Sequence, residues 1–90
     1  MSHTLSRDVL ITNKLGLHAR SAAGIAKLAQ NANSKVWLIR GKERVDASSI
    51  IDILSLACPK GSKITLEIDE ESDIDILNEI IELIKKGFGE

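Results

Sequence analysis

The sequence predicts an α+β fold in which helices cover one face of an antiparallel sheet, in the element order β-α-β-β-α-β-α. Strand-like stretches alternate with helix-like stretches, and two of the strands are separated by only three residues, so these two must run antiparallel. The length of 90 residues suits one domain, residues 1–90. Hydrophobic residues make up 43% of the chain, but only Trp37 and Phe88 are aromatic, which predicts an aliphatic core.

The first half of the chain contains a strand, a helix and a hairpin. Residues 8–12 are apolar and β-branched, as in a strand. Residues 19–32 are predicted to be helical because alanines recur at three- and four-residue steps, and their small side chains would let the helix approach the sheet closely. The strands 36–39 and 43–45 form the hairpin, in which Gly41 suits the first central position of a type II′ turn.

The second half contains a short helix, a strand and a longer helix. The short helix is predicted within residues 46–57. Its cap is left open among Asp46, Ser48 and Ser49. Residues 63–68 alternate between polar and apolar, which is typical of a half-buried strand. Ser72 is the predicted cap of the last helix, whose acidic first turn and basic last turn complement the helix dipole. The residues expected to face inward from this helix are Ile74, Leu77, Ile81 and Ile84.

Composition argues against several functional classes. The net charge of −1, from 12 basic and 13 acidic residues, gives no broad attraction to nucleic acid or to anionic membranes, and neither is expected as a partner. The start of the chain has no secretion signal and no stretch is apolar for long enough to span a membrane, so we expect a cytoplasmic protein without membrane insertion. Cys58 is the only cysteine, and metal-ligand spacings and nucleotide-binding glycine motifs are absent, so no metal and no cofactor are expected.

The strongest candidate for chemistry is His18, which immediately precedes the first helix, together with Arg20 in its first turn. A helix N-terminus carries unpaired N–H groups and partial positive charge, and a guanidinium suits phosphate oxygens, so the pair predicts an anion site. The same field disfavours the imidazolium form, and a neutral imidazole nitrogen can attack a phosphoryl group to give phosphohistidine. On spacing alone, a capping histidine and an anion site without chemistry are alternatives. His3 is expected to be inert.

Two segments resemble the HPr family, the histidine-containing phosphocarriers of the bacterial phosphotransferase system. The segment GLHARSAA, residues 16–23, resembles the active-site segment of that family, and SSIIDILSLACPKGSKITL, residues 48–66, resembles its second block. The order of elements also matches over nearly the whole chain. The resemblance implies an open-faced β-sandwich, with a four-stranded antiparallel sheet and three helices on one face.

The resemblance also implies roles for particular residues and partners. His18 would be phosphorylated on Nδ1, with Arg20 steadying the phosphoryl group. The donor would be enzyme I, charged from phosphoenolpyruvate, and the acceptors would be IIA domains that serve sugar uptake. Ser49 would be the regulatory target of an HPr kinase/phosphorylase. The residues expected to dock partners are Leu17, Ser21, Ile50, Ile51 and Leu54. Such a protein is a phosphoryl carrier rather than a turnover enzyme, and is expected to be a monomer.

Two positions depart from the family pattern. Ser21 replaces the usual proline after the active-site arginine, which restores an N–H and adds a hydroxyl. Asp52 lies one turn after Ser49, where its charge would oppose a phosphate, so a simple helix cap is the alternative role for Ser49. Two other functions compete with the carrier. One is a regulatory binding module controlled by Ser49 phosphorylation, and the other is an interaction domain with an inert histidine.

Overall fold

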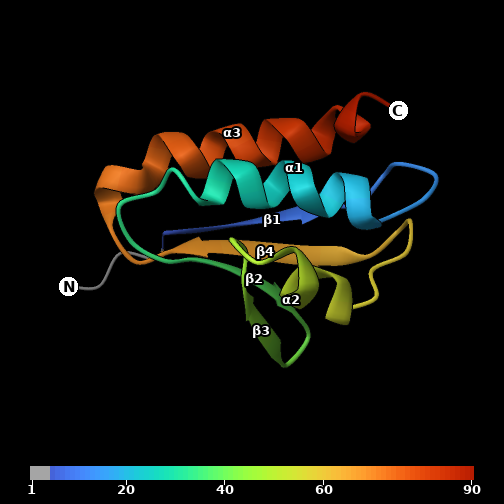
Figure 1. The fold of residues 1–90 in the computed structure, drawn as a ribbon, viewed down its shortest axis with the longest axis horizontal. Helices are drawn as coiled ribbons and strands as arrows, with labels where there is room; N and C mark the ends of the chain where they lie inside the picture. The colour runs from blue at the N-terminus through green and yellow to red at the C-terminus, as the bar shows by residue number, and fades with distance from the viewer. Residues whose placement is uncertain (1–4) are drawn as a thin grey trace.

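A computed structural model describes residues 5–90 of the chain, and His3 lies outside the described residues. The elements are β1 (Ser6–Leu10), α1 (Ala19–Ala29), β2 (Val36–Arg40), β3 (Glu43–Asp46), α2 (Ile50–Ser55), β4 (Lys63–Ile68), η1 (Glu71–Asp73), α3 (Ile74–Lys85) and η2 (Gly87–Gly89). The strands form one antiparallel sheet in the order β1-β4-β2-β3, and the three helices cover one of its faces. Figure 1 shows α1 and α3 side by side along the strands. The predicted open-faced fold is confirmed.

At each edge of the sheet, the strand pairing ends beside a turn. In the β2–β3 hairpin, Arg40 pairs with Glu43, and Gly41 between them has a φ of +60°, as the predicted tight turn requires. At the other edge, β1 begins and ends two residues earlier than predicted. Its pairing stops at Leu10 opposite Lys63, because β4 begins there. Ile11 then bonds the turn before β4 through its N–H and its carbonyl.

The core between the sheet and the helices is aliphatic, as predicted. Alternate residues of β4 are buried against the helices, and α3 contributes a row of isoleucines and leucines. The largest apolar side chains below 2% exposure are Ile11, Ile25, Leu38, Ile53, Ile64, Leu66, Leu77, Ile80, Ile81 and Ile84. Burying each such side chain contributes roughly 1.5–3 kcal/mol before the entropy cost of folding. Gly24 faces α3, and a Cβ there would lie 3.2 Å from Cδ2 of Leu83, so that side chain would have to shift slightly.

The helix ends differ from the predictions in three places. The helix predicted over residues 19–32 ends at Ala29 as α1. Ser72 does not cap α3. A 3-10 turn precedes this helix, and Asp73 is buried and accepts hydrogen bonds from the N–H groups of Asn33 and Ser34 at 2.8 and 3.0 Å. Ile74, predicted to face inward, is 38% exposed because it occupies the first residue of the helix, at the margin of the core.

Candidate functional site

His18 is the N-cap of α1, where the sequence placed it. Its backbone is extended, with φ −115° and ψ −179°, and its Nδ1 lies 3.3 Å from the amide nitrogen of Arg20, which donates to it. The His18 side chain is 29% exposed, so the ring is open to solvent beside the helix N-terminus. The Arg20 side chain is exposed on the same turn. The structure therefore places the imidazole at the helix N-terminus, with Arg20 in the first turn of the same helix.

Ser21 ties the loop before α1 to the helix. Its hydroxyl accepts a hydrogen bond from the His18 N–H at 2.9 Å and lies 3.1 Å from the carbonyl oxygens of both Gly16 and His18. The residue is 1% exposed. The hydroxyl that replaces the family's proline thus completes a capping box and does not extend into the anion site.

Two of the five predicted docking residues are not on the surface. Ser21 is held within the capping box, and Leu17 is 7% exposed and belongs to the hydrophobic core. Both side chains thus have a structural role and offer little surface to a partner, and a docking role for these two residues stays a prediction.

The loop that carries His18 is braced by the segment before β4. The Leu17 N–H donates to the Cys58 carbonyl at 2.8 Å. Gly16 has a φ of +68°, and a Cβ there would lie only 2.4 Å from the Cys58 oxygen, so this close approach requires glycine. Cys58 itself is buried, and burial raises the pKa of its thiol, which favours the unreactive protonated form.

Sequence reasoning missed two residues of the site, Glu90 and Asn13. The Glu90 carboxylate lies 2.7 Å from His18 Nε2, on the opposite side of the ring from the helix. The Asn13 amide nitrogen donates to both Glu90 oxygens, at 3.2 and 3.3 Å, and to the Gly16 carbonyl at 2.8 Å. The hydrogen bond with His18, then that from Asn13, lowers the pKa of Glu90. No local pattern could reveal a contact between residues 72 positions apart.

The second predicted region, α2, displays an apolar surface. Ile50, Ile51 and Leu54, here called the α2 patch, are 39%, 78% and 36% exposed, whereas Ile53 is fully buried. This is the exposure that their predicted docking role needs. Leu15, in the loop before His18, is 66% exposed and was not singled out from the sequence.

Ser49 is the residue that caps α2 among the three candidates. Its hydroxyl accepts a hydrogen bond from the Asp52 N–H at 3.2 Å, and its backbone is extended. The carboxylate of Asp52 lies in the first turn of the same helix. The capping role of Ser49 is thus present in the structure, and a regulatory phosphorylation there stays a prediction.

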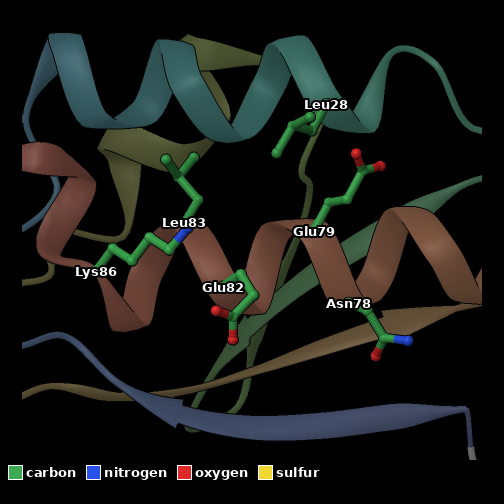
Figure 2. A pocket seen from close by; sticks show the side chains of 6 residues that line it. All are labelled: Leu28, Asn78, Glu79, Glu82, Leu83 and Lys86. Carbon is green, nitrogen blue, oxygen red and sulfur yellow. The ribbon is translucent and has the colours of Figure 1, made fainter.

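A groove between α1 and α3 lies apart from these residues. Figure 2 shows Leu28 and Leu83 pointing toward each other between the two helices, with charged side chains around them. The groove has a volume of about 410 Å³, and none of the predicted site residues lines it. Within residues 5–90 there is no group of three or more His, Cys, Asp or Glu side chains that could hold a metal ion. In that same part of the chain, no helix has the length and apolar character needed to cross a membrane.

Comparison with known proteins identifies the family. The model of the phosphotransferase-system HPr component phosphorylation site matches residues 5–86. The phosphocarrier protein HPr of Cupriavidus necator is 43% identical over 86 residues, covering 96% of this chain and 97% of the relative. The phosphocarrier protein NPr of Klebsiella oxytoca is 36% identical and covers 97% of this chain and 98% of the relative.

Solved structures give the same result. HPr-C-His from Thermoanaerobacter tengcongensis superimposes with a TM-score of 0.89 at 32% identity, covering 94% of this chain and 96% of that one. HPr from Bacillus anthracis superimposes with a TM-score of 0.84 at 26% identity, covering 92% of this chain and 99% of that one. The chain therefore belongs to the HPr family of the phosphotransferase system, whose members are phosphoryl carriers and not turnover enzymes.

Proposed function

We propose that His18 accepts a phosphoryl group on Nδ1 from enzyme I, which phosphoenolpyruvate has charged, and passes it to IIA domains during sugar uptake. One observation carries this proposal: Nδ1 faces the N–H groups at the start of α1, where a phosphoryl group bound to it would meet hydrogen-bond donors. Arg20, exposed on the first turn, adds a positive charge to this end of the helix.

The transfer step uses the lone pair of Nδ1. That pair attacks phosphorus and forms the N–P bond, while the bond to the donor's leaving group breaks and the leaving group keeps its electron pair. The Arg20 N–H, which bonds Nδ1 before the reaction, is then placed to bond a phosphoryl oxygen. The helix N-terminus and the guanidinium offset the phosphoryl charge, and the reverse displacement hands the group to the acceptor.

Partners would cover the exposed apolar residues around this site. The α2 patch offers three side chains of the kind that protein partners bury. Leu15, which precedes His18 by three positions, offers a fourth. We propose that enzyme I and the IIA domains use this surface in turn, in the cytoplasm. The protein is predicted to be a monomer. A related solved structure is described as an HPr dimer from Thermoanaerobacter tengcongensis, so light scattering of the purified chain is the appropriate check.

A second candidate function is regulatory, with sugar uptake secondary. Two of the similar curated proteins, from Klebsiella oxytoca and Shewanella violacea, are phosphocarriers named NPr rather than HPr, so the relatives divide between two kinds of carrier. In this reading, an HPr kinase/phosphorylase would modify Ser49. Labelling with ATP and that kinase, set against labelling with phosphoenolpyruvate and enzyme I, separates the two functions.

The decisive experiment maps the phosphate. After incubation with phosphoenolpyruvate and enzyme I, the chain is expected to carry one acid-labile phosphate on His18. A His18→Ala variant should carry none, and the matched Ser49→Ala variant should be labelled like the parent. Equal labelling of the His18→Ala variant would overturn the proposed function.

A further inference from the structure

We infer that Glu90 is a positioning residue for His18: its carboxylate holds the imidazole with the proton on Nε2, which leaves the lone pair on Nδ1. This inference rests on the proposed phosphotransfer at His18 and says which feature of the chain prepares the nucleophile. It follows from two contacts on opposite edges of one ring and from a third residue that holds the carboxylate in place.

The two ring contacts require the same tautomer. A neutral imidazole has one N–H and one lone pair, and the partner of each nitrogen decides which it carries. The Glu90 carboxylate is only an acceptor, so Nε2, at 2.7 Å, must donate to it. The Arg20 backbone amide is only a donor, so Nδ1, at 3.3 Å, must accept from it. The opposite tautomer would face lone pair with lone pair at Glu90 and N–H with N–H at Arg20.

Asn13 holds the Glu90 carboxylate in the position from which it contacts the His18 ring. Its amide nitrogen donates to both oxygens of Glu90 and to the Gly16 carbonyl, so three acceptors surround the NH₂ group. Its Oδ1 is buried and has no hydrogen-bond partner among the described residues. Turning the amide over would place Oδ1 against those acceptors, so this orientation is retained despite an unsatisfied buried oxygen. The hydrogen bonds from His18 and Asn13 also lower the pKa of Glu90, because both favour its ionised form.

The same carboxylate acts during transfer. When the Nδ1 lone pair forms the N–P bond, the ring becomes cationic, because the Nε2 proton stays in place while Nδ1 gains phosphorus as a third bonded atom. The donor's leaving group keeps the electron pair of the broken bond. The ionised Glu90, 2.7 Å from Nε2, offsets the ring charge as it develops. A carboxylate that orients a histidine and stabilises its cationic form is an established arrangement in nucleophilic catalysis.

The test compares Glu90→Ala and Glu90→Gln with Glu82→Gln, a control at an exposed carboxylate on α3. The first readout is the tautomer of His18, from imidazole ¹⁵N chemical shifts at a pH where the ring is neutral. The parent and the control should show mainly the Nε2–H form. In Glu90→Ala the tautomer ratio should shift about tenfold toward Nδ1–H, the effect of losing one charge-assisted hydrogen bond, and Glu90→Gln should lie between.

The second readout is the initial rate of His18 phosphorylation by enzyme I. Glu90→Ala should reach the same final labelling at His18 but about tenfold more slowly, with partial recovery in Glu90→Gln. An unchanged tautomer ratio, or an unchanged rate, in Glu90→Ala would overturn the role of Glu90 while His18 labelling stands. Failure of the proposed function looks different: the parent would take no phosphate, whatever its tautomer.

Discussion

The N-termini of α1 and α2 are built alike but differ in charge. Each helix begins after a capping residue with an extended backbone, His18 before α1 and Ser49 before α2, and each cap accepts a hydrogen bond from a backbone N–H of the first turn. The first turn of α1 contains no acid and presents Arg20, whereas that of α2 contains Asp52. An added phosphate would therefore be stabilised at α1 and opposed at α2. The comparison favours His18 over Ser49 as the site that accepts a phosphoryl group.

The largest expected effect comes from the loop before α1, where Gly16 approaches the Cys58 carbonyl closely. Gly16→Ala would place a Cβ 2.4 Å from the Cys58 carbonyl at a left-handed backbone position. We expect it to lower the free energy of unfolding by about 3 kcal/mol, measured by urea denaturation. Gly61→Ala is the control, because it has a φ of +93° but nothing within 4 Å of the new Cβ. Its cost should be about 1–2 kcal/mol, and equal costs would mean that the close approach to Cys58 is unimportant.

Acid pH should weaken the hydrogen bonds that Asp46 accepts in the segment before α2. Asp46 accepts hydrogen bonds from Lys35 Nζ at 2.7 Å and from the Ser48 hydroxyl and N–H at 2.6 and 2.8 Å. The bond from Lys35, then that from Ser48, lowers the pKa of Asp46 from 3.8 to about 2. Because the folded pKa lies below the unfolded one, its stabilisation is complete above about pH 4 and is lost as the pH falls toward 2.

That loss should be about 1–2 kcal/mol after allowance for solvent screening of a partly exposed pair. Urea denaturation of the parent and of Asp46→Asn at pH 7, 4 and 2.5 measures it. The two proteins should differ most at pH 7 and least at pH 2.5. A constant difference across this range would show that the ionised carboxylate is not the source.

The parts of the site found from sequence are those with local signals. The position of His18 follows from the alanine periodicity that begins after it, and the buried face of α3 follows from its isoleucine and leucine spacing, except at Ile74. Two of the errors have long-range causes. Ser72 was a reasonable cap by local rules, but the next residue, Asp73, instead binds two amides some forty positions away. The Glu90 contact with His18 spans 72 positions and was not foreseeable.

Arg20→Ala tests the charge that distinguishes α1. The side chain is exposed and forms no ion pair within residues 5–90, so its removal should change the free energy of unfolding by less than about 0.5 kcal/mol. The rate of His18 phosphorylation should fall about tenfold, which corresponds to the loss of one charge-assisted contact with the phosphoryl group. Lys27→Ala, in the last turn of α1, is the matched loss of a positive charge and should leave the rate unchanged. Equal rates for both variants would remove Arg20 from the proposed mechanism.

Asp52→Asn makes the N-terminus of α2 more like that of α1, and its effect should be the smallest. The Asp52 carboxylate interacts favourably with the dipole of α2, so the substitution should lower the free energy of unfolding by about 0.5 kcal/mol. The same change removes the charge that opposes a phosphate on Ser49, and labelling by ATP and an HPr kinase/phosphorylase should become easier. The phosphorylation rate of His18 is the internal control, because the two helix ends carry separate caps. If Asp52→Asn leaves Ser49 labelling unchanged, charge does not explain the contrast between the two helix N-termini, and the Ser49 hydroxyl is better understood as the cap that the structure shows.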